Sequence, residues 1–284
     1  MMNWLTYGLI DVATYTQSFF VFLAFLLWFL SVKRHINIKN NLKLLSQIAG
    51  VALIGALISP FVIQVLRGRM LQFFAGMGKA ISTIHNGHTL WKFLMASYQG
   101  VSITAGFFLL VLVIRLMPSA KKLTFPLLHP FILFASVSRL GCFAKGCCFG
   151  KKIDPDSFLA TVYPPNSPAS AYFNKTEQLM SRFQPSLPVH PTQIYLVLSL
   201  ITLFAVQHFL WQKKIVTNYT IAIIAVAGYG IINFFIEFLR QEQVMYNLLT
   251  LGQFLDIGLV LLALSMFFAR PVSRQKKIQG KSTT

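Results

Sequence analysis

The stretch TYTQSFFVFLAFLLWFLSV (residues 14–32) decides the class of fold, because it is long, apolar and free of charged residues. A helix needs roughly 20 apolar residues to cross about 30 Å of hydrocarbon, and this stretch has that length. The chain of 284 residues is 55% hydrophobic and only 11% charged, whereas a soluble domain carries about 25% charged residues. The sequence therefore predicts an integral membrane protein.

Further apolar blocks follow the first one along the whole chain. We count seven, at about 14–32, 44–66, 95–116, 123–147, 191–211, 216–239 and 248–269. Each span must satisfy its own backbone hydrogen bonds in lipid, so we expect an all-α, polytopic bundle of about seven transmembrane helices. No convincing cleavage site follows the first block, which we therefore expect to stay in the bundle as an anchor. A single integral-membrane domain should extend over residues 1–284.

The net charge of +18 comes largely from basic residues in the loops, which is typical of membrane topology rather than of a nucleic-acid-binding surface. Residues 33–43, 115–122, 212–214 and the tail at about 270–284 carry 14 of the 25 Lys and Arg residues and none of the seven Asp and Glu residues. If the spans alternate, these segments share one side, which the positive-inside rule places in the cytoplasm. We therefore expect the N-terminus outside, the C-terminus and its basic tail inside, an external loop or cap at about 148–190, and no nucleic-acid partner.

Several charged residues lie inside an apolar block or directly at its end, and an ionised group costs about 2.5–3.5 kcal/mol at the bilayer centre. We single out four of them as site candidates. They are Arg139, Glu237, Arg240 and Asp256. Counting residues along each span at 1.5 Å per residue places all four at a similar depth, in the outer half of the membrane. Such a group of two cations and two anions indicates a polar cavity that opens outward.

The sixth block adds detail in AGYGIINFFIEFLRQE (residues 227–242). At 100° per residue, Tyr229, Asn233, Glu237 and Arg240 share one helix face. Glu237 and Arg240 stand three residues apart and can form a salt bridge, either as a packing device or within a site. An arginine also matches the geometry of a phosphate, which makes Arg139 a candidate for binding a lipid phosphate.

The fifth block begins at VHPTQIY (residues 189–195). His190 and Gln193 stand three residues apart at the start of this helix, and the proline between them fits its first turn. His190 is either a candidate site residue or an interfacial residue without a role.

All three cysteines of the chain lie in SRLGCFAKGCCFG (residues 138–150). Three interpretations remain open for them: a zinc site, a disulfide, or small residues in a tightly packed helix end. The spacing fits zinc poorly, because structural sites favour two C-x2-4-C pairs and no second pair exists. We therefore predict no metal site, and give most weight to packing, with Gly141, Gly146 and Gly150 allowing close approach of another backbone.

Several motifs resemble the prolipoprotein diacylglyceryl transferase family. SRLGCFAKGCCFG is similar to the family signature G-R-x-G-N-F-x-N-x-E-x-x-G, sharing Arg139, Gly141, Phe143 and Gly150. HPTQIY at 190–195 resembles H-P-[ST]-Q-[LI]-Y, NFFIEFLR at 233–240 resembles R-F-x-x-E-F-x-R, and LGQ at 251–253 resembles M-G-Q. Departures from the family pattern include Cys147 for a glutamate, Asn233 for an arginine, and Gln99, in YQGVSITAG, for the histidine of H-G-G.

The resemblance implies transfer of a diacylglyceryl group from phosphatidylglycerol to the lipobox cysteine of a prolipoprotein, at the bacterial inner membrane. It implies no metal or other cofactor, and the partners are the lipid and the prolipoprotein signal peptide. The implied catalytic residues are Arg139, Glu237, Arg240 and His190. The implied lipid-binding residues are Arg139, Tyr15, Gln99, Gln193, Asn233 and Gly150.

Two other functions remain open from the sequence. Because several family residues are replaced, the chain could be a divergent family member that binds lipid or transfers a lipid group to another acceptor, or one that is inactive. Charges within the spans would also suit a transporter of small solutes, although those charges lie only in the outer half.

Overall fold

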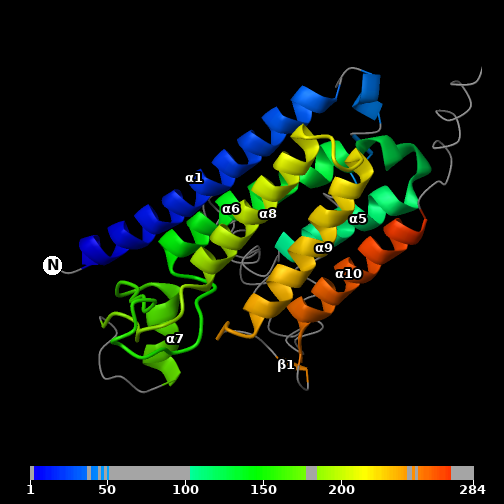
Figure 1. The fold of residues 1–284 in the computed structure, drawn as a ribbon. Helices are drawn as coiled ribbons and strands as arrows, with labels where there is room; N and C mark the ends of the chain where they lie inside the picture. Colours follow the sequence, from blue (N-terminus) through cyan, green and yellow to red (C-terminus); the bar gives the residue numbers. More distant parts are fainter. Residues whose placement is uncertain are drawn as a thin grey trace, which may run out of the picture.

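The computed structural model describes residues 3–36, 40–43, 46–47, 50, 103–176, 184–241, 245–246 and 249–269. Helices make up most of this part of the chain, and the long ones lie roughly alongside one another (Figure 1). The helices are α1 (Asn3–His35), α5 (Ile103–Leu116), η1 (Pro118–Leu123), α6 (Thr124–Lys145), α7 (Pro168–Thr176), α8 (Thr192–Gln212), α9 (Asn218–Glu237) and α10 (Leu251–Phe268). Two short antiparallel strands, β1 (Met245–Tyr246) and β2 (Leu249–Thr250), join α9 to α10.

Five of the described helices are long and apolar enough to cross a membrane. They cover Tyr15–His35, Ala120–Lys145, Thr192–Gln212, Asn218–Glu237 and Leu251–Phe268, and they match five of the seven predicted blocks. Within the predicted block 95–116, the described part is the shorter apolar helix α5. Nearly all of the predicted block 44–66 lies outside the described residues, as do the loop 67–94 and the basic tail 270–284.

The outer surface of the bundle is strongly apolar. Large hydrophobic side chains such as Phe22, Phe235 and Phe268 are well exposed on α1, α9 and α10. Water would penalise so large an apolar surface, whereas lipid solvates it. The fold thus fits a polytopic membrane bundle, while the side on which each terminus lies stays a prediction.

Helix α6 lies at the centre, packed against α1 and α8, and α9 packs between α8 and α10. Phe107 of α5 stacks on Phe131 of α6 at 4.2 Å between ring centroids, and Tyr229 of α9 meets Phe107 edge-on at 4.9 Å. Trp28 of α1 donates a hydrogen bond from Nε1 to the Leu127 carbonyl at 3.2 Å. These contacts hold the polar face of α9 against α6.

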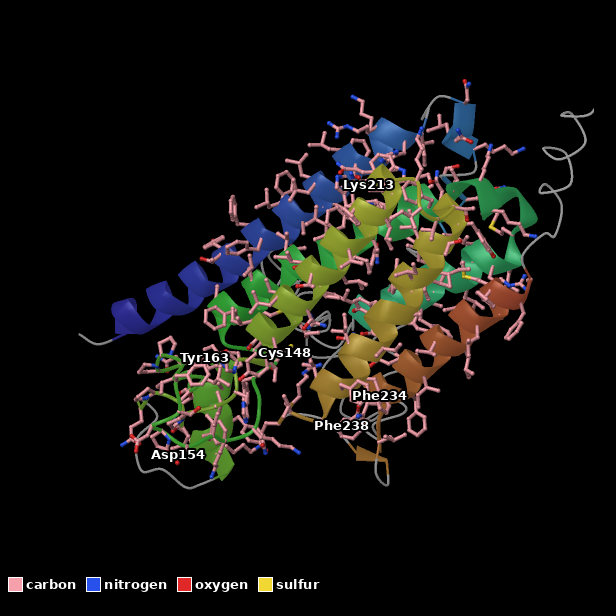
Figure 2. All side chains as sticks on the ribbon, viewed as in Figure 1. Cys148, Asp154, Tyr163, Lys213, Phe234 and Phe238 are labelled. Atoms are coloured by element: carbon pink, nitrogen blue, oxygen red, sulfur yellow. The ribbon has the colours of Figure 1, made fainter. Side chains whose placement is uncertain are left out.

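Basic residues gather at one end of the bundle. His35, Lys121 and Lys122 line an open cavity of about 400 Å³ there, together with Trp211 and Asn218. Lys213 lies at this end, while Asp154 lies at the opposite end (Figure 2). Basic residues of three predicted cytoplasmic segments thus lie at the end opposite Asp154, while the side of the membrane that this end faces stays a prediction.

The segment that we call the cap (residues 146–176 and 184–190) follows α6 at the end opposite the basic residues (Figure 1). Its own apolar cluster consists of Phe149, Tyr163, Ala169, Phe173 and Val189. Backbone bridges join Val189 to Thr161 and to Lys152. This cap begins two residues before the predicted loop 148–190, and its described part carries one helix, α7, with little other regular structure.

Candidate active site

Three segments that are far apart in the sequence meet where α6 ends. Residues 147–151 lie between the start of α8 and the end of α9. Gly150 donates its backbone N–H to the His190 carbonyl at 2.9 Å, and Lys151 donates to the Leu239 carbonyl at 2.7 Å. Gly150 also forms a backbone bridge with Arg240. The three sequence motifs that contain Arg139, His190 and Arg240 therefore form one structural unit.

Side chains at the start of α8 reinforce this junction. Thr192 donates from Oγ1 to the Cys148 carbonyl at 2.7 Å, and Gln193 donates from Nε2 to the Cys147 carbonyl at 2.6 Å. Gln193 also accepts a hydrogen bond from the Tyr163 hydroxyl at 2.9 Å. Burial raises the pKa of the Tyr163 hydroxyl, which keeps it as a hydrogen-bond donor. Gln193 thus joins the cap to the bundle, and its contact with lipid stays a prediction.

The predicted glycine contacts are confirmed at two positions. A Cβ on Gly141 would lie 3.0 Å from the Gln17 carbonyl oxygen, where α1 crosses α6. A Cβ on Gly150 would lie 2.6 Å from the His190 carbonyl oxygen. Real side chains essentially never approach so closely, so the glycines permit the backbone contacts.

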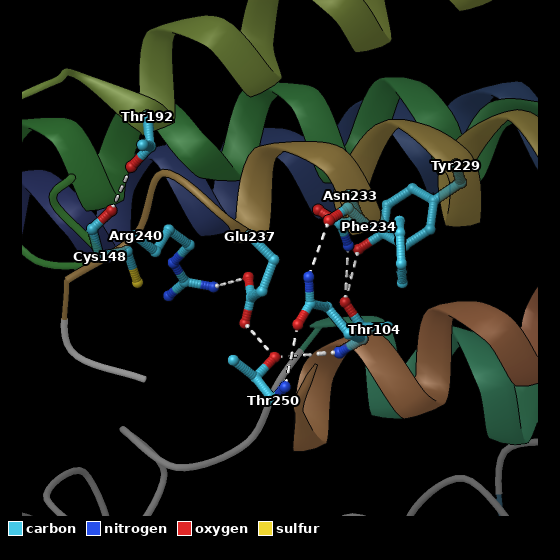
Figure 3. Close-up of polar contacts among 10 residues, drawn as sticks. Thr104, Cys148, Thr192, Tyr229, Asn233, Phe234, Glu237, Arg240 and Thr250 are labelled. Atoms are coloured by element: carbon cyan, nitrogen blue, oxygen red, sulfur yellow. Dashed lines mark hydrogen bonds and ion pairs between the residues drawn. The ribbon is translucent and has the colours of Figure 1, made fainter. Parts of the chain in front are cut away.

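Glu237 and Arg240 form the predicted salt bridge at the end of α9. Arg240 Nη1 lies 2.8 Å from Glu237 Oε2, and Thr250 donates from Oγ1 to Glu237 Oε1 at 3.4 Å (Figure 3). The Nε of Arg240 is buried without a partner among the described residues. Part of the guanidinium is therefore held in place, and part of it is available to another group.

Arg139 lies on α6 with 6% of its surface exposed. It is close enough to Glu237 for the charge of that carboxylate to act on it. No described residue forms a hydrogen bond or an ion pair with its guanidinium. Because arginine stays charged and a buried charge requires compensation, this guanidinium is suited to an anionic group of a ligand.

A row of polar side chains continues along the predicted face of α9. Asn233 donates from Nδ2 to Thr104 Oγ1 at 2.7 Å, and the Tyr229 hydroxyl lies 3.3 Å from the same oxygen (Figure 3). Asp256, 1% exposed on α10, has one carboxylate oxygen without a hydrogen-bond partner among the described residues. The four charged residues that the sequence placed at one depth therefore do lie in one region.

Other predicted residues are less closely involved. His190 Nδ1 lies 3.1 Å from the Tyr195 hydroxyl, beside the junction. Tyr15 lies on α1 with 73% of its side chain exposed, and no contact with the cluster is recorded for it among the described residues. Gln99 lies outside the described residues.

Two contributing threonines escaped the sequence analysis. Thr250 caps α10 by accepting a hydrogen bond from the Gln253 backbone N–H, while Gln253 accepts one from the Thr250 backbone N–H. The pattern T-x-x-Q is a capping-box signal and could have placed this threonine at the helix start. Thr192 carried no comparable signal for its contact with Cys148, because that partner is 44 residues away.

Comparison with known proteins identifies relatives of this chain. The family model for prolipoprotein diacylglyceryl transferase matches residues 4–269. A phosphatidylglycerol–prolipoprotein diacylglyceryl transferase of Neisseria meningitidis serogroup B is 30% identical over 190 residues, which is 62% of this chain and 66% of that enzyme. One from Burkholderia cenocepacia is 28% identical over 186 residues, 59% of this chain and 62% of that enzyme. The aligned part spans just under two thirds of the length of these relatives.

Proposed function

This chain belongs to the prolipoprotein diacylglyceryl transferase family, and we propose that it transfers a diacylglyceryl group from phosphatidylglycerol to a cysteine thiol of a prolipoprotein. The transfer would take place at the bacterial inner membrane. The observation that carries this proposal is the junction of three motifs, which gathers Arg139, Glu237, Arg240 and His190 at one end of the bundle.

The two arginines, Arg139 and Arg240, bind the phosphate of the donor lipid. Arg139 is buried with no partner among the described residues, and Arg240 has a buried Nε without one. Preorganised cations of this kind stabilise the charge that develops on a departing phosphate oxygen. Glycerol phosphate is the leaving group of the proposed reaction, so both cations act on the bond that breaks.

Glu237 positions Arg240 rather than reacting itself. One carboxylate oxygen binds the guanidinium and the other accepts a hydrogen bond from Thr250, which fixes the carboxylate between α9 and α10. A side chain held at both oxygens is poorly placed to exchange a proton with a substrate. His190 lies beside the junction and is the residue in this region that could accept a proton from the acceptor thiol.

Complementation tests the proposal in cells. A bacterial strain depleted of its own transferase should regain growth and mature lipoproteins when it expresses the wild-type protein. The Arg139→Ala variant, at equal abundance in the membrane, should not restore either. Failure of the wild-type protein, present in the membrane at normal abundance, would count against the proposed function.

A further inference from the structure

The three cysteines form one cluster. The Sγ atoms of Cys142, Cys147 and Cys148 all lie within 4.8 Å of one another. All three side chains are half-buried, and none forms a disulfide. This is the one group of three or more His, Cys, Asp or Glu side chains with this geometry in the part of the chain that the structure describes.

The backbone builds this cluster in two steps. Gly146 adopts a left-handed conformation, with φ 71°, and ends α6, so that the Cys147 N–H reaches back to the Cys142 carbonyl at 3.1 Å. This is the hydrogen bond of a Schellman motif, and it brings positions 142 and 147 together. Cys148 is also left-handed, with φ 60°.

A left-handed cysteine is unfavourable, and such residues persist where the surrounding structure holds them. Neighbouring side chains on an extended chain point in opposite directions, whereas the turn at Cys148 places both adjacent sulfurs near Cys142. Thr192 and Gln193 hold the carbonyls of Cys148 and Cys147, so the α8 helix fixes the turn. Packing alone would not require three thiols to converge.

The sulfur spacing suits a thiophilic metal ion. A Zn–S bond of about 2.3 Å gives sulfur–sulfur separations of about 3.8 Å in a tetrahedral site. Since no pair of sulfurs here is separated by more than 4.8 Å, each needs to move by less than about 1 Å to reach that geometry. A disulfide would join two of the sulfurs and leave the third without a partner.

We propose that Cys142, Cys147 and Cys148 bind one thiophilic divalent metal ion, such as Zn²⁺, whose fourth position receives the acceptor thiol of the substrate. This role in transfer rests on the proposed function. Catalytic zinc sites keep three protein ligands and one open position, and no fourth ligand joins the cluster among the described residues. Three thiolates and one divalent ion leave one negative charge. Arg240, which lies beside Cys148 in Figure 3, and Arg139 are near enough to Cys148 to stabilise that charge.

The metal would activate the acceptor thiol of the substrate. A thiol that binds the metal loses its proton to solvent, and its sulfur then attacks the glyceryl carbon bonded to the phosphate oxygen. The S–C bond forms as the C–O bond breaks, and the electron pair of the broken bond stays on the departing glycerol phosphate. The metal keeps its oxidation state, and the thioether product is released. With the thiol activated in this way, transfer would not require His190 as the base, nor the family histidine that Gln99 replaces.

Metal binding is measured first, without reference to activity. The full-length protein is purified in detergent, reduced, freed of metal and titrated with Cd²⁺, whose bonds to thiolates absorb in the ultraviolet. We expect one equivalent to bind, and each variant Cys142→Ser, Cys147→Ser and Cys148→Ser to weaken binding by at least about 100-fold. Lys213→Gln, at the opposite end of the bundle, keeps all three thiols, serves as the control and should still bind Cd²⁺ (Figure 2).

A second measurement needs no variant. Cd²⁺ should protect all three thiols of the wild-type protein from an alkylating reagent. If the reduced wild-type protein takes up no Cd²⁺, or if the serine variants bind as tightly as the wild type, the metal site is excluded. The metal site would also be excluded if the native protein contained a disulfide between two of these cysteines and still failed to bind Cd²⁺ after that disulfide had been reduced.

The role in transfer is tested separately. Transfer of the diacylglyceryl group to a lipobox peptide should require Zn²⁺. In a second experiment, the protein is loaded with Co²⁺, whose absorption spectrum reports its ligands. A cysteine peptide should change that spectrum, and the matching serine peptide should not. If the metal-free, reduced protein transfers as fast as the Zn²⁺-loaded protein, the role in transfer is wrong and the proposed function stands. If Cd²⁺ and Zn²⁺ bind the cluster but neither the metal-free nor the Zn²⁺-loaded protein transfers a diacylglyceryl group, the proposed function fails and the metal site stands.

Discussion

The guanidinium of Arg240 is bound on one side by the Glu237 carboxylate, at 2.8 Å from Nη1 to Oε2, while its Nε is buried with no partner in the described part of the chain. An ion pair that served only packing would favour satisfying every buried donor. The arrangement instead holds the guanidinium in a fixed orientation and leaves hydrogen-bonding capacity for a ligand. The phosphate of the donor lipid is the group that this capacity suits best.

Replacement of Arg240 by lysine tests the need for a guanidinium. Arg240→Lys keeps the positive charge but loses the planar, two-pronged donor, so the ion pair with Glu237 and the contact with phosphate can no longer form together. We expect kcat/KM for diacylglyceryl transfer to fall by at least about 100-fold. Lys213→Ala, at the exposed basic end, is the control and should keep wild-type activity. Equal activity of Arg240→Lys and the wild type would contradict the assigned role.

Gly252 at the start of α10 gives a sharper test of the Glu237 carboxylate. A Cβ at this position would lie 2.6 Å from Glu237 Oε1, so Gly252→Ala must displace the carboxylate, which is the end of a flexible side chain. We expect transfer activity to fall by about 10-fold or more while the melting temperature changes little, because Arg240 loses its orientation.

The matched control for this variant is Gly106→Ala on α5. A Cβ there meets nothing within 4 Å, and alanine favours a helix by roughly 0.5–1 kcal/mol over glycine. This control should keep full activity and unfold slightly later on heating. If Gly252→Ala also keeps full activity, the precise placement of Glu237 does not matter for transfer.

The sequence predicted the all-helical bundle well, while the depth of the charged residues in the membrane stays a prediction. Long uncharged blocks leave few alternatives in lipid, and five of them appear as long apolar helices. The i,i+3 spacing of Glu237 and Arg240 was enough to predict their salt bridge, although α9 ends at Glu237 and Arg240 lies just after the turn that follows it. The polar contact of Asn233 with Thr104, in contrast, joins residues 129 positions apart and could not be read from spacing.

The cysteines show where the sequence analysis was weakest. Their spacing of five and one residues is unlike the paired motifs of structural zinc sites, so a metal was not expected. Two left-handed residues, Gly146 and Cys148, create the three-thiol cluster, and a linear pattern does not reveal the backbone conformation of Cys148. Whether the cluster binds metal stays a prediction.

Gln193 offers a test of how the cap is attached. Gln193→Ala removes its hydrogen bonds to the Cys147 carbonyl, at 2.6 Å, and from the Tyr163 hydroxyl, at 2.9 Å, and leaves both groups buried. We expect a loss of about 1–3 kcal/mol in stability and faster proteolysis within residues 148–190. Thermal unfolding in detergent and limited proteolysis measure these effects.

Gln212→Ala is the matched control for the cap, because Gln212 is exposed at the other end of the same helix. It should leave both measurements unchanged. A Gln193→Ala protein whose cap resists protease as well as the control would show that Gln193 does not hold the cap in place.

The most direct test of the account is mass spectrometry of an acceptor peptide after incubation with the full-length, reduced protein, phosphatidylglycerol vesicles and Zn²⁺. We predict that a lipobox peptide gains one diacylglyceryl group on its cysteine, with release of one glycerol phosphate for each peptide modified. A serine peptide, or the Arg139→Ala protein, should give no product. A folded wild-type protein that leaves the cysteine peptide unmodified under these conditions would contradict the account.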